Sequence, residues 1–157
     1  MVILGIDPGT TIVGYGIIEK SRKTKLIDYG VIRTGGEKQE KRLVKINEAL
    51  AKIIKKYSPT VAGLETLFFS TNKKTALSVA EARGAIILTL AKNKIPIMEF
   101  SPNNIKMAVS GYGRSDKAAM EKIISLTFSL KKTGMPDDAF DALAIALRAS
   151  FEIKSGG

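Results

Sequence analysis

Runs of apolar residues, separated by polar and glycine-containing breaks, divide the chain into short strands and longer helices. The first run, residues 2–7, is rich in β-branched residues and continuous rather than alternating, which is typical of a short buried strand. Residues 11–19 and 25–34 are two further β-rich runs joined by a polar segment, as in a hairpin. Together these runs predict a three-stranded meander. Glycines within its strands can mark close approach of another backbone, at Gly14, Gly16 and Gly30.

A helical pattern follows the Gly35-Gly36 break and ends at Ser58-Pro59, with apolar residues at steps of three and four. Residues 61–65 then predict a short inner strand, and residues 94–100 predict a last strand. Between these strands we expect a helix over residues 73–92. One face of that helix is a stripe of mostly small residues: Ala76, Ala80, Gly84, Ile87 and Ala91. We expect this stripe to pack on the sheet, and the alternative is contact with a second copy of the helix.

Three shorter helices complete the expected pattern. Ser101-Pro102 is an N-cap followed by proline at the first helical position, and this helix runs to about residue 109. Ser115 is expected to cap a helix over residues 116–126. Asp137 is expected to cap the closing helix, which lies within residues 136–151.

Composition narrows the chemistry. The 157 residues are expected to form a single domain, residues 1–157, and they contain neither cysteine nor histidine. This excludes a Cys nucleophile, a Ser-His triad, disulfides and the usual His/Cys zinc sites. A net charge of +10 favours a polyanionic partner, although a merely soluble lysine-rich surface is the alternative. With no signal peptide or membrane-spanning run, we expect a soluble cytoplasmic protein with no membrane partner.

Acidic residues stand where strands and a helix begin or end. Asp7 closes the first strand before Pro8-Gly9, and Glu65 closes residues 61–65. Asp138 and Asp141, three residues apart, share one edge of the closing helix. Capping of the Pro-Gly turn and a favourable helix dipole are simpler explanations for some of these acids. The alternative is a set of carboxylate ligands for Mg²⁺ or Mn²⁺.

The order β-β-β-α-β-α-β-α-α-α, with acids after the first and fourth strands and on the last helix, resembles the RNase H-like superfamily of nucleases. Five motifs are similar to those of the RuvC family of bacterial Holliday junction resolvases: GIDPGT, GLETLFF, ARG at residues 82–84, SGYGRSDK and PDDAFDALAIA. The resemblance covers essentially the whole chain. It implies an α/β fold with a mixed five-stranded sheet, in which an antiparallel three-strand meander is joined by two parallel strands and flanked by helices.

The family resemblance implies a metal-dependent endonuclease that makes paired symmetric nicks in four-way DNA junctions during recombination and repair, leaving 5′-phosphate and 3′-OH ends. It places Asp7, Glu65, Asp138 and Asp141 at the active site as catalytic metal ligands. Two Mg²⁺ ions per site, with Mn²⁺ as a substitute, can drive in-line hydrolysis of a phosphodiester. The implied partners are four-way junction DNA, a second copy of the chain in a homodimer, and the RuvA and RuvB branch-migration proteins.

The resemblance also suggests DNA contacts. Lys106 and Lys117 match functional lysines near the scissile phosphate, and Phe68 matches an aromatic that meets an unstacked base. Further DNA-binding candidates are Phe69, Asn72, Lys73, Lys74, Arg83 and Arg114. The chain departs from the family in two places. It lacks a histidine after DALA, and it has Ala118-Ala119 where the family usually has a polar pair.

Two other functional classes fit parts of the sequence. GIDPGT also resembles the phosphate-binding turn of actin-like ATPases and sugar kinases, which need a second, similarly folded domain. A non-catalytic junction-binding module is supported by the charge alone, and four uncompensated acids would weaken its phosphate binding.

Overall fold

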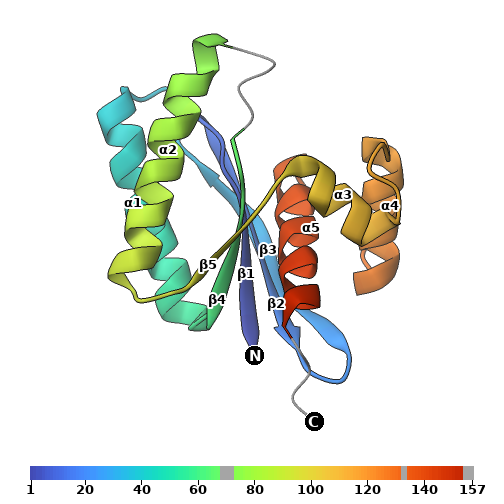
Figure 1. The fold of residues 1–157 in the computed structure, drawn as a ribbon. Helices are drawn as coiled ribbons and strands as arrows, with labels where there is room; N and C mark the ends of the chain where they lie inside the picture. The colour runs from blue at the N-terminus through green and yellow to red at the C-terminus, as the bar shows by residue number, and fades with distance from the viewer. Residues whose placement is uncertain (68–72, 132–133, 154–157) are drawn as a thin grey trace.

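The computed structural model describes residues 1–67, 73–131 and 134–153. The elements found there, shown in Figure 1, are β1 Val2–Asp7, β2 Ile12–Lys20, β3 Thr24–Arg33, α1 Gln39–Tyr57, β4 Val61–Glu65, α2 Lys73–Lys92, β5 Ile97–Phe100, α3 Pro102–Ser110, α4 Lys117–Phe128 and α5 Asp137–Glu152. Their order confirms the one predicted from the sequence.

All of these strands belong to one five-stranded sheet in the order β3-β2-β1-β4-β5. β1, β2 and β3 form the antiparallel meander, whereas β4 runs parallel to β1 and to β5. The predicted fold class is therefore confirmed. In the parallel pair Ile6 lies opposite Leu64, so β1 and β4 end side by side. Asp7 and Glu65 consequently meet at the same end of the sheet.

Helices cover both faces of the sheet. Figure 1 shows α1 and α2 on one face and α5 on the other, with α3 and α4 outside α5. The alternation of side chains along β1 divides the core accordingly. Ile3 packs with α5, while Leu4 and Ile6 pack with α1 and α2. β1 is thus buried on both faces, which explains its continuous apolar sequence.

α5 approaches the sheet closely because both surfaces carry small residues. The helix buries an alanine face, and a Cβ at Gly5 of β1 would stand 2.0 Å from the carbonyl oxygen of Ala142. The prediction that glycines mark close approach is confirmed at Gly14 and Gly16, which face α5. At Gly30 the neighbour is a side chain instead, the ring of Tyr15.

Two helix starts differ from the prediction by one residue. Asp116, not Ser115, caps α4, and its carboxylate accepts a hydrogen bond of 2.8 Å from the N–H of Ala119. The hydroxyl of Ser115 donates to the carbonyl of Tyr112 in the preceding turn. Pro136, not Asp137, precedes α5, so Asp137 is already helical and its carboxylate pairs with Lys117 at 2.9 Å. Both predicted caps were therefore wrong: in α4 the neighbouring Asp116 is the cap, and in α5 the carboxylate of Asp137 binds Lys117 of another helix instead of its own backbone.

α2 has the predicted bounds but turns a different face to the sheet. Ala82, Ile86 and Leu90 are the residues buried in the core, since the two large aliphatic side chains bury more apolar area than a small stripe can. Gly84 is exposed, with open space where a Cβ would be. The prediction that the small-residue stripe seats this helix on the sheet was therefore wrong.

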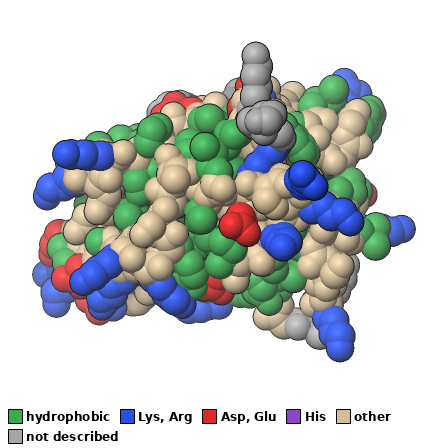
Figure 2. Space-filling model, turned by 90° about the horizontal axis from the view of Figure 1, so that it is seen from below, with side chains coloured by type: hydrophobic (Ala, Val, Ile, Leu, Met, Phe, Trp, Pro, Cys, Tyr) green, Lys and Arg blue, Asp and Glu red, His purple; other side chains and the backbone are tan. Residues whose placement is uncertain are grey.

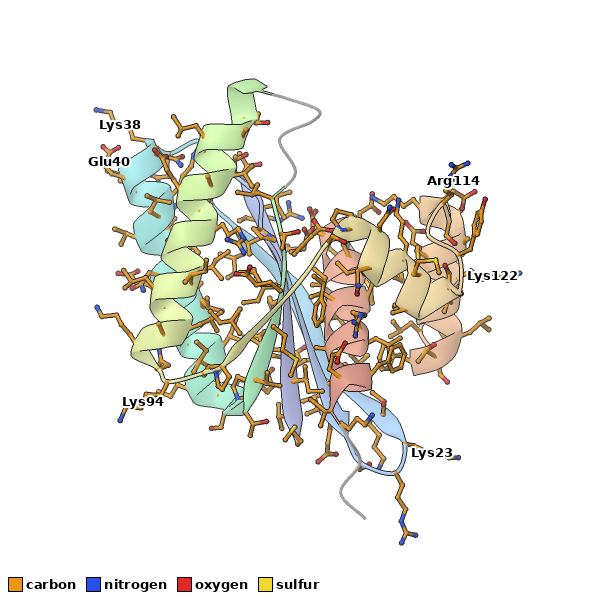
Figure 3. All side chains as sticks on the ribbon, viewed as in Figure 1. Lys23, Lys38, Glu40, Lys94, Arg114 and Lys122 are labelled. Carbon is orange, nitrogen blue, oxygen red and sulfur yellow. The ribbon has the colours of Figure 1, made fainter. Side chains whose placement is uncertain are left out.

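The last strand is shorter than predicted and begins at Ile97. Lys94, labelled in Figure 3, has a φ of 58° in the left-handed region, which ends α2 in a turn. Pro96 has no N–H to donate, although its carbonyl accepts from the N–H of Ala62. Regular pairing with β4 can start only after these residues.

Lys and Arg side chains are spread over the face of the molecule seen in Figure 2, in keeping with the net charge of +10. Within the described ranges, none of the helices combines the length and apolar character needed to cross a bilayer.

Candidate active site

A cavity of about 350 Å³ opens where β1 and β4 end and meet α3, α4 and α5. Its charged lining consists of three acids and two lysines: Asp7, Glu65, Asp141, Lys106 and Lys117. Pro102, Ile105, Met120 and Ala144 form an apolar wall. Three of the four predicted acids and both predicted lysines therefore line one cavity, although five separate elements supply them.

Asp7 is held on the central strand of the sheet. Its pKa is raised from 3.8 to about 8, first because the carboxyl is buried and then because the charges of Asp141, Glu65 and Asp138 repel its own. Lys117 lowers this pKa and only partly offsets those effects. An acid in this position holds either a proton or a cation near neutral pH.

Glu65 is the last residue of β4, and its carboxylate enters the cavity beside that of Asp7. Burial followed by the charge of Asp141 raises its pKa from 4.5 to about 7, while Lys106 acts in the opposite direction. The two strand ends therefore present two acids that resist ionisation in the absence of a cation.

Asp138 and Asp141 come from the first turns of α5. Asp141 is an exposed residue that lines the cavity. Partial burial of its carboxyl raises its pKa most. Lys117 lowers the pKa and the charge of Asp138 raises it. Asp138 does not line the cavity itself, but its charge also raises the pKa of Asp7. The four predicted acids thus form one electrostatic group.

Lys117 and Lys106 supply the positive charge of the cavity from α4 and α3. The ammonium of Lys117 forms its ion pair with Asp137, which raises the pKa of this lysine. Both partners of that pair are largely exposed. No pattern in the sequence indicates this pair, because the capping of a helix is enough to explain Asp137.

The donor set suits a hard divalent cation. Carboxylate oxygens are the ligands that Mg²⁺ and Mn²⁺ prefer, and a bound cation would remove the repulsion that raises these pKa values. Among the residues that the structure describes, no three acidic side chains are already gathered tightly enough to hold a metal ion. Asp7, Glu65 and Asp141 line one cavity and suit such a cation, but their carboxylates do not converge on a single point.

The remaining predicted DNA contacts lie elsewhere. Arg114 is exposed in the loop before α4, at the end of the molecule formed by α3 and α4 (Figure 3). Arg83, on α2, bonds to Glu99 and to the carbonyl of Glu65. Three candidates lie outside the described residues and two are described only in their backbone: Phe68, Phe69 and Asn72, and Lys73 and Lys74.

The contact of Arg83 with Glu65 is a feature of the site that the sequence analysis missed. The two residues are 18 positions apart, and the acceptor is a main-chain carbonyl. No side-chain pattern in the sequence could have indicated it.

Comparisons of the sequence and of the structure with known proteins point to the same family. Residues 3–149 match the family model described as Crossover junction endodeoxyribonuclease RuvC. The crossover junction endodeoxyribonuclease RuvC of Petrotoga mobilis is 50% identical over 148 residues, which are 93% of this chain and 91% of that protein. The one from Clostridioides difficile is 47% identical over 149 residues, 94% of this chain and 88% of that protein. Among solved structures, T. thermophilus RuvC in complex with Holliday junction substrate has a TM-score of 0.89 at 28% identity, covering 97% of this chain and 94% of that chain.

Proposed function

Because the chain belongs to the family of RuvC crossover junction endodeoxyribonucleases, we propose that it resolves Holliday junctions by hydrolysing phosphodiesters in four-way DNA. It makes paired symmetric nicks and leaves 5′-phosphate and 3′-hydroxyl ends. The observation that carries this proposal is the cavity in which Asp7, Glu65 and Asp141 face Lys106 and Lys117. Membership of this family decides against the ATPase and sugar-kinase interpretation of GIDPGT.

Asp7, Glu65, Asp138 and Asp141 would hold two Mg²⁺ ions, with Mn²⁺ as a substitute. Divalent ions in such a site lower the pKa of an attacking water and offset the charge that develops on the leaving 3′ oxygen. The protein contributes the placement of the donors: β1 and β4 fix two carboxylates on the sheet, and α5 fixes the other two.

The lysines would bind the scissile phosphate. Lys117 is paired with an exposed Asp137, and an exposed ion pair is worth only about 0–1 kcal/mol. Lys117 can therefore exchange this partner for a phosphate oxygen at little cost. The apolar wall that includes Ile105 and Met120 limits water on one side of the site, which strengthens the electrostatic interactions there.

Other parts of the chain would hold the junction. We propose that Phe68, and with it Phe69, stacks on an unpaired base at the crossover. Polar and basic residues that follow Phe69 in the sequence, together with one in the loop before α4, would contact phosphates: Asn72, Lys73, Lys74 and Arg114. Such contacts make affinity fall steeply with salt.

We propose that the working unit is a symmetric homodimer that joins through the outer face of α2. Leu77, Gly84 and Leu88 are exposed there, together with Val44 of α1. A groove of about 450 Å³ runs between the two helices and includes Gly84, Leu88 and Val44 in its lining. A two-fold dimer presents two identical sites to the approximately two-fold symmetric open junction.

RuvA and RuvB are the proposed protein partners, on the strength of family membership. We place the reaction in the cytoplasm, because the chromosomal DNA of a bacterial cell lies there.

The proposal is tested by incubating the protein with a mobile four-way junction and with a linear duplex of the same sequence, each with Mg²⁺, with Ca²⁺ and with EDTA. We expect Mg²⁺-dependent nicks at symmetric positions in the junction only, with ligatable products. Equal cleavage of the duplex, or hydrolysis of ATP in place of DNA, would assign the chain to another class. Binding of the junction without cleavage in any of the three conditions would favour the non-catalytic module.

A further inference from the structure

Arg83 holds the end of the strand that carries Glu65. It lies within α2, and only 16% of its side chain is exposed. Its Nε donates a hydrogen bond of 3.2 Å to the carbonyl oxygen of Glu65. Its Nη2 pairs with Oε1 of Glu99 on β5 at 2.7 Å. One guanidinium therefore joins α2 to both β4 and β5.

The guanidinium reaches Glu65 from the face of the sheet opposite the cavity. Leu64 packs in the core formed with α1 and α2, so alternation along β4 sends the side chain of Glu65 to the other face, into the cavity. Glu99 lies opposite Leu64 in the β4–β5 ladder and shares its face. Arg83 thus contacts the main chain of Glu65 without entering the cavity.

This contact falls where regular pairing of β4 ends. Glu65 is the last strand residue, and only the N–H of Thr66 continues the ladder, by donating to the carbonyl of Phe100 at 2.9 Å. A side chain at the end of a strand has fewer ladder hydrogen bonds to fix its direction than one in mid-strand. The planar guanidinium, with N–H groups in a fixed arrangement, binds two acceptors at once and removes that freedom.

We propose that Arg83 is a positioning residue for the metal site: by fixing the main chain of Glu65, it fixes the direction in which that carboxylate enters the cavity. This inference rests on the proposed role of Glu65 as a metal ligand. It gives Arg83 a role in place of the DNA contact suggested by the family resemblance. It also ties the active site to α2, the helix that carries the proposed dimer surface.

Arg83→Lys and Arg83→Gln test the proposal, with Arg148→Lys and Arg148→Gln as matched controls. Arg148 is 13% exposed and also uses two groups of its guanidinium, on Asn104 and Glu152, but neither partner lines the cavity. For each protein we would measure the Mn²⁺ concentration that half-saturates the rise in melting temperature of the free protein. Junction affinity in Ca²⁺ and the single-turnover cleavage rate across Mg²⁺ concentrations complete the set.

Both Arg83 variants are expected to need about tenfold more Mn²⁺ and Mg²⁺, as is typical when a group that orients a metal ligand is lost. Their junction affinity should match that of the wild type, and the Arg148 variants should keep wild-type metal binding. Wild-type metal dependence in Arg83→Lys would overturn the proposal, since a bare positive charge would then suffice. Weaker junction binding by the Arg83 variants with unchanged Mn²⁺ binding would also overturn it, because Arg83 would then be a DNA contact. An equal loss of metal binding in the Arg148 variants would overturn it as well.

If neither Arg83 variant folds, Glu99→Gln decides, because it removes one partner and leaves the bond to Glu65. A smaller shift in the same direction supports the proposal, and unchanged metal dependence overturns it. Mn²⁺ binding by the free protein needs no DNA. A wild type that binds Mn²⁺ but leaves junctions intact would therefore refute the proposed function and not this inference.

Discussion

Gly14 of β2 lies directly beneath the first turn of α5, so close that a Cβ at Gly14 would stand 1.9 Å from the carbonyl oxygen of Asp138. The same glycine pairs with Asp7 in the β1–β2 ladder. Gly14 therefore sets how near α5, with Asp138 and Asp141, can come to the central strand. The acids can act as one group only because no side chain separates these two elements.

Gly14→Ala is expected to impair cleavage more than junction binding. The methyl group would meet backbone atoms that cannot rotate away, so α5 must shift, and overpacking of this kind costs about 1–3 kcal/mol. Melting temperature, junction affinity and cleavage rate would be measured together. Gly35→Ala is the control, because open space surrounds Gly35. Wild-type cleavage by Gly14→Ala would show that the site tolerates a displaced helix.

The fold was largely predictable because its main determinants are local. The continuous run of β1, the polar hairpin after β2 and the bounds of α2 follow from patterns within a few residues. The prediction for the buried face of α2 was wrong, because Ile86 and Leu90 bury more apolar area in the core than the stripe of small residues can. The cap of α5 was missed because Asp137 has a partner, Lys117, on another helix.

The cavity was predictable only in part, for a similar reason. Acids at strand ends stand out in a sequence, since an ionisable group beside a buried run is expensive without compensation. The resemblance to a family connected them to each other and to Lys106 and Lys117. A contact to a main-chain atom, such as that of Arg83 with the carbonyl of Glu65, produces no recognisable pattern of residues in the sequence.

Replacement of any one of the four acids by its amide is expected to abolish cleavage and leave junction binding intact or stronger. Each of these carboxylates adds negative charge where a phosphate of the DNA must approach: Asp7, Glu65, Asp138 and Asp141. Loss of one carboxylate should therefore abolish cleavage without lowering the affinity for the junction. Gel-shift and cleavage assays on the four variants check this. Asp137→Asn is the matched control, and an active Asp138→Asn would transfer the role to Asp137.

The melting temperature of the metal-free protein is expected to fall as pH rises from about 5 to 8. Asp7 and Glu65 have folded pKa values of about 8 and about 7 against ordinary values of 3.8 and 4.5. Between these values the folded protein binds more protons than the unfolded chain, so the stability that protonation confers is present at low pH and lost as pH passes the folded pKa values. Each kcal/mol lost lowers the melting temperature by roughly 2–4 °C at this chain length.

Mg²⁺ should counter that fall, because it binds the ionised acids of the folded protein only. Calorimetry of the wild type and of Asp7→Asn, with EDTA and with Mg²⁺, separates these effects. Asp7→Asn should show a flatter pH profile and a smaller gain with Mg²⁺. A metal-free wild type that becomes more stable from pH 5 to 8 would contradict the assignment of these acids.

Phe68→Ala is expected to slow junction cleavage about tenfold or more without unfolding the protein, since base–aromatic stacking is worth roughly 1–3 kcal/mol per base. Phe151→Ala is the control, as Phe151 is an exposed phenylalanine near the end of α5. A loss of melting temperature comparable to that of a core cavity would mark Phe68 as a packing residue. Fluorescence of 2-aminopurine at the crossover would report the stacked base directly.

Leu88→Glu is expected to give a folded monomer that binds junctions more weakly and no longer makes paired nicks. Leu77 and Leu88 are 69% and 57% exposed on the face of α2 that also carries Gly84, so a large apolar side chain and a close backbone approach are available on one surface. A charge at Leu88 would be buried without a partner if two copies met there. Leu126→Glu places the same charge at a leucine of α4 that is 72% exposed.

Sedimentation velocity and a cleavage assay that distinguishes single from paired nicks would be run on both variants. Because Leu126 is outside the proposed surface, Leu126→Glu should remain a dimer that nicks both strands. A Leu88→Glu protein that stays dimeric and active would place the contact on another face, whereas a monomeric Leu126→Glu would place it on α4. Loss of paired nicking with single nicks retained would show that each protomer holds a complete site, and that α2 serves to present the two sites to one junction together.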